Sequence, residues 1–482
     1  MPFNSLLFLF FFLPVTLALY HVSGYRLRNF TLLLASLLFY AWGGMVSLPV
    51  LLWIIVGNYL FGLLLMRLSS AIWRKALLAL GIAVNLVPLV HYKYTGFLLV
   101  NLNLLFPDHH FSFHVPSQSH IPLGMSFIAF HAISYLVDVF RGRASGQKNP
   151  LQLGLYLAFF PKVLSGPIHR YADAASQLPF RQVTLDGFSK GVERFIIGLA
   201  KKMLLANALA EIADTIFQIP AVYLSVEASW LGAVCYTLQI YFDFSGYTDM
   251  AIGLGYMFGF RLPENFNYPY LAQSVQEFWQ RWHITLSQWF RDYLYIPLGG
   301  NRRGNVRTYG NLCVVFLLCG LWHGANWTFI VWGLMHGLFL VLERWRLAAF
   351  LARCPRLVRH LYLLLFIVVS WVFFRAETLN GALGYLGAML GIGTQPQTNP
   401  WLLLKMDRQI ALVLALSCLF AFPLVPFIID FLRRFADTQG NRGELYLNIF
   451  RGIKVVGFSC LFLLALMEMA SGTYNPFIYF RF

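Results

Sequence analysis

Apolar stretches with few or no charged residues recur along the whole chain of 482 residues. Only 12% of the residues are charged, against roughly 25% in a soluble domain, and 59% are hydrophobic. The stretches are continuous rather than alternating, which favours membrane-spanning helices over a barrel. We therefore expect an all-α polytopic membrane protein, a helical bundle in a single domain over residues 1–482. About eleven hydrophobic elements are expected, namely Leu6–Tyr20, Phe30–Trp42, Pro49–Met66, Ala76–Val90, Ile121–Phe140, Val192–Phe217, Ala228–Phe258, Asn311–Leu342, Leu361–Phe374, Ile410–Leu432 and Val455–Met469.

The stretch Asn311–Leu342 is too long for a single membrane crossing. Its 32 residues would extend roughly 48 Å as one helix, whereas the hydrocarbon core is ~30 Å thick. Basic residues flank both of its ends, as they do for Leu151–Leu164. If both flanks are cytoplasmic, each segment enters the membrane and returns, which requires burial in protein or a cavity. We expect a break or hairpin near Gly320–Ala325, with His323 at the bottom of a cavity.

The net charge of +16 is interpreted as loop charge that sets the membrane topology. No basic patch with spaced aromatic residues lies outside the apolar stretches, so nucleic-acid binding is not expected. The positive-inside rule places the N-terminus and the loop Pro107–His120 outside. The first apolar run lacks a basic leader and a cleavage site, so we expect it to remain as a membrane helix. The basic clusters predicted to be cytoplasmic are Arg26/Arg28, Arg67/Arg74/Lys75 and Arg141/Arg143/Lys148.

His323 is the strongest candidate for chemistry on the residues alone. It lies in the run Leu321–Trp327, and its apolar flanks contain no fully charged residue. An ionisable group at membrane depth is costly and indicates a functional site, and imidazole transfers protons near neutral pH. A hydrogen-bonded structural histidine is the alternative, and the two interpretations are evenly balanced. For His131 and His336, also in apolar runs, the structural interpretation is preferred.

The segment Gln273–Leu294 has the spacing of an amphipathic helix with an apolar side rich in tryptophan. We expect it to lie at the cytoplasmic membrane interface. His283 falls on the border of the apolar stripe, about 80° from its centre, from where it can point towards protein.

Of the few acidic residues inside apolar runs, Asp138, Asp243 and Asp249 are the strongest candidates for a specific role. Hydrogen bonding to a basic partner on another helix is slightly preferred over a role in orienting substrate or a histidine. The nucleophile elbow, the phosphate-binding loop and the His-Glu-x-x-His zinc motif are absent. The six cysteines show no Cys-x-x-Cys spacing, and no metal site is expected.

Several motifs follow one another in order along nearly the whole chain. They include Leu38–Trp42, Pro122–Phe127, Ser134–Val139, Phe160–Lys162, Ser165–Pro167, Tyr241–Asp249, Pro263–Phe266, Phe278–Ser287, Tyr295–Arg302, Leu321–Gly324 and Phe477–Phe482. In these motifs the chain resembles the membrane-bound O-acyltransferase family. Within that family it is similar to the bacterial branch of the alginate O-acetyltransferases and teichoic-acid D-alanyl transfer proteins.

The resemblance implies a helical bundle with re-entrant segments, a central tunnel and two functional histidines. His323 matches the family's Trp-His-Gly motif as the catalytic residue, and His283 matches the second histidine. The implied activity is transfer of an acetyl group from a cytoplasmic thioester such as acetyl-CoA to an exported polysaccharide. Alginate is the first candidate and cellulose the second. Expected partners are the inner-membrane bilayer and a periplasmic SGNH-type acetyltransferase or esterase, or a polysaccharide-export complex.

The basic residues Arg281, Arg291, Arg302 and Arg303 are candidates for binding the phosphates of a coenzyme A-type donor. Contact with anionic lipid is an equally good explanation of this cluster. Other functions remain open at this stage: teichoic-acid-type D-alanyl transfer, peptidoglycan acyl transfer, a transporter, or a non-catalytic scaffold in polysaccharide export. A transporter would require two related halves, and the chain contains no internal repeat.

Overall fold

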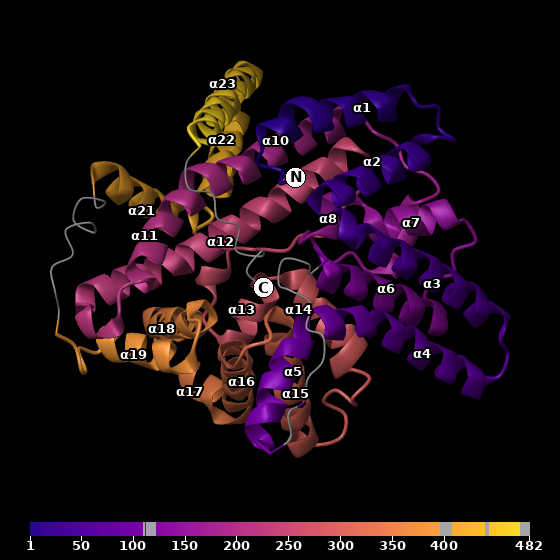
Figure 1. Cartoon of the computed structure of the whole chain (residues 1–482). Coiled ribbons are helices and arrows are strands. Elements are labelled where there is room, and N and C mark those ends of the chain that lie inside the picture. Colours follow the sequence, from indigo (N-terminus) through magenta and orange to yellow (C-terminus); the bar gives the residue numbers. More distant parts are fainter. Residues whose placement is uncertain (109–110, 112–121, 396–406, 439–442, 473–482) are drawn as a thin grey trace.

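The computed structural model describes residues 1–108, 111, 122–395, 407–438 and 443–472, and its regular elements are all helices. The N-terminal helices α1 (Leu13–Val22), α2 (Arg28–Gly43), α3 (Leu48–Arg67) and α4 (Ala71–Leu89) form one side of the molecule (Figure 1). Helices α18 (Arg356–Arg375) and α19 (Leu379–Met389) lie on the opposite side. These helices confirm the predicted all-α architecture.

A helix of 32 residues, α12 (Val226–Met257), runs through the centre of the molecule (Figure 1). Every residue from Cys235 to Gly255 is buried, as expected for a helix that is apolar on all sides. Helix α10 (Leu185–Ala200) packs along it at glycine positions. A Cβ atom on Gly253 would lie 2.6 Å from the backbone oxygen of Gly191, so only glycine permits this approach. Gly253 is therefore a helix-packing residue.

Two of the three candidate acidic residues are paired with basic residues of α10 and of the π-helix Lys201–Ala206 that follows it. Asp243 lies 2.7 Å from Lys202, and both side chains are almost completely buried. Asp249 contacts Arg194 at 2.7 Å and Lys201 at 2.8 Å. Because unpaired charges are costly in this environment, these contacts explain why the acids are tolerated. The prediction of basic partners on another helix is confirmed for both residues.

Four of the described helices are long and apolar enough to cross a membrane: Leu48–Arg67, Ala71–Leu105, Arg356–Arg375 and Glu444–Ala470. The pair α21 (Arg408–Phe420) and α22 (Leu424–Thr438) gives a fifth candidate if its 65° bend is counted as a broken span. Other predicted elements are shorter apolar helices, such as Phe8–Val22 and Met125–Phe140. Hydropathy identified these stretches as apolar, but apolar surface can be buried against protein as well as in lipid. The predicted outer loop Pro107–His120 lies mostly outside the described residues.

The long stretch around His323 is a helical hairpin. Helix α15 (Asn305–His323) ends at the histidine, and α16 (Trp327–Leu342) begins four residues later. Asn326 caps α16 by accepting a hydrogen bond from the backbone of Thr328. A Cβ atom on Gly320 would lie 2.3 Å from the backbone oxygen of Phe329, so the two helices touch backbone to backbone. The predicted break between Gly320 and Ala325 is therefore confirmed.

The segment Leu151–Leu164 is also interrupted. Helix α7 (Pro150–Ala158) stops at Phe159, and the single turn α8 (Phe160–Val163) follows. All residues from Leu153 to Val163 are buried, so the irregular backbone is enclosed by protein. This is the condition under which a non-helical segment is stable at membrane depth.

Candidate functional site

His323 is the last residue of α15 and is buried, with 4% of its surface exposed. Aromatic rings surround its imidazole: the centroid distances are 4.6 Å to Trp322 and 5.0 Å to both Trp332 and Phe374. Its Nδ1 atom has no hydrogen-bond partner among the described residues. A buried polar atom without a partner in a native protein requires an explanation, and a bound reactant is one of them.

The turn that carries His323 is held by the π-helical segment Val90–Tyr94, which joins α4 to α5 (Thr95–Leu105). Lys93 donates from Nζ to the backbone oxygens of Trp322, at 2.6 Å, and His323, at 3.2 Å. The hydroxyl of the next residue, Tyr94, donates to the backbone oxygen of Leu321 at 2.7 Å. These three carbonyls are among those that have no hydrogen-bond partner within the helix, because they lie at its C-terminal end. The positive charge of Lys93 also interacts favourably with the negative end of the helix dipole. Sequence reasoning did not select Lys93, because nothing local links it to residues more than 200 positions away.

His283 does not lie on one continuous amphipathic helix, so that prediction is wrong. The segment consists of α13 (Val275–Arg281) and α14 (Ile284–Phe290), separated at Trp282 and His283. His283 has a φ angle of +43°, a left-handed conformation that costs about 1–3 kcal/mol and is found preferentially at functional sites. The tryptophan-rich side is buried in the protein core, so it does not rest on a lipid surface. The helical spacing of apolar residues continues across the break in the sequence, because α13 and α14 both bury their tryptophan-rich side.

Asn265 fixes the orientation of His283. Its Oδ1 atom lies 3.0 Å from Nδ1 of His283 and accepts from both the backbone nitrogen of Thr285, at 3.3 Å, and its hydroxyl, at 2.9 Å. Because the Thr285 backbone can only donate, the amide atom facing it is oxygen, and Nδ1 of His283 must carry the proton. The other ring atom, Nε2, is then an acceptor, and it is buried without a partner among the described residues.

The structure brings the two predicted histidines together around one indole ring. Trp322 lies 4.6 Å from the ring of His323 and 5.9 Å from the ring of His283. Phe130 and Phe127 pack on the same indole at 5.3 and 5.5 Å. The indole Nε1, a donor only, also lacks a partner among the described residues. A proton acceptor, an indole donor and a second imidazole therefore share one water-poor, aromatic environment.

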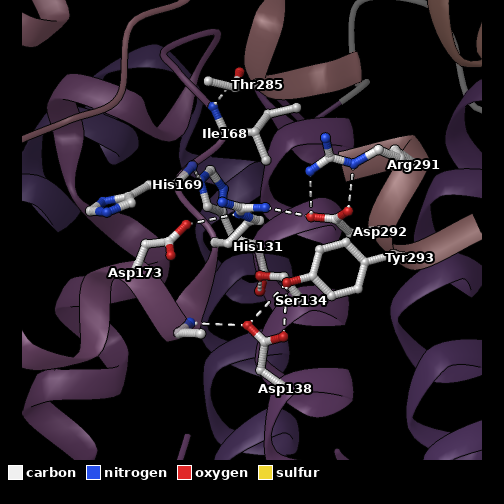
Figure 2. A network of polar contacts seen from close by, with 12 residues as sticks. His131, Ser134, Asp138, Ile168, His169, Asp173, Thr285, Arg291, Asp292 and Tyr293 are labelled. Carbon is white, nitrogen blue, oxygen red and sulfur yellow. Dashed lines mark hydrogen bonds and ion pairs between the residues drawn. The ribbon is translucent and has the colours of Figure 1, made fainter. Parts of the chain in front are cut away.

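A second polar network adjoins this site (Figure 2). The backbone nitrogen of Ile168 donates to the Thr285 hydroxyl at 3.0 Å, and the next residue, His169, donates from its backbone to Nε2 of His131 at 3.2 Å. His131 is therefore a hydrogen-bonded structural residue, as predicted. His336 accepts at Nδ1 from the indole nitrogen of Trp279 at 3.1 Å, whereas its Nε2 is buried without a partner among the described residues.

The same network contains the third acidic residue, Asp138. Its carboxylate accepts from the hydroxyl of Tyr293 at 2.9 and 3.0 Å and from the backbone of Ala172 at 3.0 Å. Asp138 thus has a tyrosine and a backbone partner instead of the predicted basic one. Both partners come from other segments, so the residue ties helix α6 (Met125–Phe140) to its neighbours.

The four candidate donor-binding arginines occupy different environments. Arg281 pairs with Glu277 at 2.9 Å, and Arg291 pairs with Asp292 at 2.7 Å. Burial opposes ionisation of Asp292, but hydrogen bonds and charge from Arg291 and Arg170 outweigh it, so the pKa of this carboxyl lies below its usual value. Arg302 and Arg303 are exposed, and no ion pair to them is found within the described part of the chain. Arg302 and Arg303 are therefore better placed than Arg281 to meet an external phosphate.

Comparison with known proteins agrees with the resemblance seen in the motifs. Residues 80–383 match the model of the MBOAT, membrane-bound O-acyltransferase family. The chain is 40% identical to the probable alginate O-acetylase of Pseudomonas putida and 39% identical to that of Azotobacter vinelandii, with 100% of each chain covered. It is also 39% identical to a peptidoglycan O-acetyltransferase of Helicobacter pylori, over 81% of this chain and 80% of the relative. The chain therefore belongs to the membrane-bound O-acyltransferase family and is a multi-pass membrane O-acyltransferase.

Proposed function

We propose that this protein transfers an acetyl group from a cytoplasmic thioester to an exported polysaccharide, with alginate as the first candidate. The observation that carries the proposal is the pair of buried imidazoles, His323 and His283, each with a nitrogen that lacks a partner among the described residues. The full-length similarity to proteins named as probable alginate O-acetylases supports the choice of acceptor.

His323 acts as the general base in this proposal. It takes the proton from the acceptor hydroxyl while the hydroxyl oxygen attacks the thioester carbonyl. The tetrahedral intermediate then collapses, the carbon–sulfur bond breaks, and His323 returns the proton to the leaving thiolate. General acid–base assistance of this kind contributes about 10²–10⁴-fold.

The tautomer of His283 limits the roles that His283 and Trp322 can have in the reaction. Because the Nδ1 proton of His283 is donated to Asn265, Nε2 of His283 is a hydrogen-bond acceptor. In this role it orients the acetyl donor. It cannot stabilise an oxyanion in this state, since it has no proton to offer there. The indole N–H of Trp322, buried between the two imidazoles, is the group that we assign to the developing oxyanion.

Donor and partner follow from the same proposal. Acetyl-CoA or a similar thioester approaches from the cytoplasm, where Arg302 and Arg303 meet its phosphates, with Arg281 and Arg291 in structural ion pairs. The acetyl group is presented on the outer side of the bacterial inner membrane. In this scheme the hydroxyl that His323 deprotonates is a serine of a periplasmic SGNH-type acetyltransferase, which becomes the acetyl ester and then passes the acetyl group to the sugar hydroxyl. The relative from Helicobacter pylori favours peptidoglycan as the second candidate acceptor.

The test is the acetyl content of the polymer made by cells whose only copy carries His323→Ala, at matched membrane protein level. His131→Gln is the control, because His131 is equally buried but both of its ring nitrogens have hydrogen-bond partners. Loss of acetyl groups with normal polymer yield in His323→Ala alone would support the proposal, and sugar analysis would name the acceptor. Unchanged acetylation would remove His323 as the base and favour a scaffold or transport role.

A further inference from the structure

Two arginines share the ring of one buried tyrosine where α1 ends and α2 begins. The guanidinium carbon of Arg28 lies 5.5 Å from the centroid of the Tyr20 ring, and that of Arg181 lies 5.6 Å from it. Tyr20 is in the last turn of α1, Arg28 is the first residue of α2, and Arg181 comes from the loop before α10. The fold therefore holds two like charges close together, which is unfavourable unless an opposite charge joins them.

Arg181 is almost completely buried, and its hydrogen-bond acceptors are neutral. Its Nε atom donates to the hydroxyl of Tyr20 and to the backbone oxygen of Phe258, both at 3.1 Å. Its Nη1 atom donates to Oδ1 of Asn29 at 2.6 Å. The remaining nitrogen, Nη2, is buried and has no partner among the residues that the structure describes. One arm of this guanidinium is thus left for a ligand.

Arg28 has no partner for its charge within the described ranges of the chain. It makes no hydrogen bond or ion pair there, and its Nε atom is buried. The positive charge of Arg28, together with burial, lowers the pKa of Arg181 from its usual value. Buried charges are normally paired, as Asp243 is with Lys202 in this protein. Two unpaired guanidinium groups on one ring indicate an anion site, and their planar forks match the oxygens of a phosphate.

The surroundings of the two arginines favour a lipid as the source of this phosphate. Large apolar side chains that adjoin them along the chain are exposed, namely Val22, Leu27, Phe30 and Phe180. Exposed apolar surface beside basic residues is typical of the boundary between headgroups and acyl chains. The ring of Tyr25 packs on that of Phe180 at 5.6 Å, and aromatic side chains are enriched at this depth of a bilayer.

We propose that Arg28 and Arg181 bind the phosphate of an anionic membrane phospholipid such as phosphatidylglycerol. Its acyl chains lie along the exposed apolar side chains of α1 and α2. The bound phosphate removes the repulsion between the two arginines and ties these helices to the loop before α10. A zwitterionic headgroup fits less well, because it would bring its own ammonium close to two cations. Helices α1 and α2 lie on the side of the molecule away from the hairpin α15–α16 that carries His323 (Figure 1).

The test is lipid retention by the purified full-length protein. The protein is stripped in detergent, incubated with micelles that contain equal amounts of phosphatidylglycerol and phosphatidylethanolamine, and analysed by native mass spectrometry. We expect one phosphatidylglycerol per chain, preferred over phosphatidylethanolamine by at least about fivefold. Equal retention of the two lipids by the unmodified protein would overturn the headgroup assignment.

A matched pair of variants locates the site. Arg28→Gln removes a cation that makes no hydrogen bond within the described structure, so folding should be preserved, and the preference is expected to fall below about twofold. Arg26→Gln removes an exposed cation two positions earlier that does not lie over the Tyr20 ring, and is expected to keep the preference. Equal loss, or equal preference, in the two variants would overturn the location.

An excess of coenzyme A distinguishes a lipid phosphate from that of a soluble ester. The protein loaded with phosphatidylglycerol is incubated with coenzyme A and analysed in the same way. We expect the lipid to be retained, because coenzyme A has no acyl chains to lie along the apolar side chains. Displacement of the lipid from the unmodified protein by coenzyme A would assign the arginines to a soluble phosphate ester and overturn the lipid assignment.

Discussion

Nδ1 of His283 lies 3.0 Å from Oδ1 of Asn265, and this contact sets the proton on the imidazole. The same oxygen receives both donors of Thr285, which removes the ambiguity of the amide orientation. His283 is therefore held as the tautomer whose free nitrogen faces away from Asn265 as an acceptor. This arrangement makes the role of His283 sensitive to a residue that does not touch the reactants.

Replacing Asn265 is expected to impair acetyl transfer without changing the histidines themselves. Asn265→Ala removes the acceptor, and a loss of about 1–2 kcal/mol in orienting His283 corresponds to about 5- to 30-fold in kcat. Asn265→Asp keeps an acceptor of the same shape and should be less impaired. The measurement is acetyl transfer by purified protein at matched folded fraction. Equal defects in the two variants would argue against orientation through this oxygen.

The left-handed backbone at His283 predicts an unusual order of stabilities. Both His283→Gly and His283→Ala should lose activity, because neither has an imidazole. The glycine variant should nevertheless be the more stable by about 1 kcal/mol, because only alanine pays the left-handed penalty. Thermal unfolding in detergent compares the two. An alanine variant as stable as the glycine variant would contradict the positive φ angle.

Lys93 is predicted to be a positioning residue for His323. Lys93→Met keeps the length of the side chain but removes the donors to the carbonyls of Trp322 and His323. We expect kcat to fall about 10-fold, equivalent to about 1.4 kcal/mol, with KM for the donor nearly unchanged.

Lys93→Arg restores the cation and is expected to recover part of the rate. Tyr94→Phe removes the adjacent donor to Leu321 and should have a smaller effect, because that carbonyl is farther from the imidazole along the chain. A proportional loss of folded protein in Lys93→Met, with normal kcat for the folded fraction, would show that Lys93 has only a structural role.

The hairpin at His323 depends on direct backbone contact between its helices. Gly320→Ala places a methyl group 2.3 Å from the backbone oxygen of Phe329, which forces α15 and α16 apart. The expected destabilisation is about 1–3 kcal/mol, accompanied by loss of activity. Gly310→Ala on the same helix meets nothing within 4 Å and serves as the control. Thermal unfolding of the two variants should differ clearly, and similar midpoints would contradict the close contact.

The sequence predicted those parts of the structure that depend on length and hydropathy. The 32 apolar residues around His323 required a break, and the break is at Gly324. The pairing of Asp243 and Asp249 with basic residues followed from the cost of a buried charge. The choice of His283 as the second histidine came from the family motif, since its position on an apolar border is shared by many structural residues.

The remaining features depend on contacts between distant segments. The break at Trp282 and His283 is invisible to periodicity, because the apolar face is the same on both sides of it. Lys93 resembles an ordinary basic residue at a membrane boundary until its contacts with Trp322 and His323 are known. Asn265 stands inside a recognised motif, but only the fold shows which of its atoms faces His283.

The most direct test of the account is acetyl transfer from radiolabelled acetyl-CoA by the purified protein, with the proposed periplasmic acetyltransferase and an alginate oligosaccharide as acceptor. His323→Gln is compared with the unmodified protein at equal folded fraction. We predict that His323→Gln lowers kcat at least about 100-fold, the lower limit for a general base, while donor binding measured separately is preserved. Transfer by His323→Gln at a rate close to that of the unmodified protein would contradict the account.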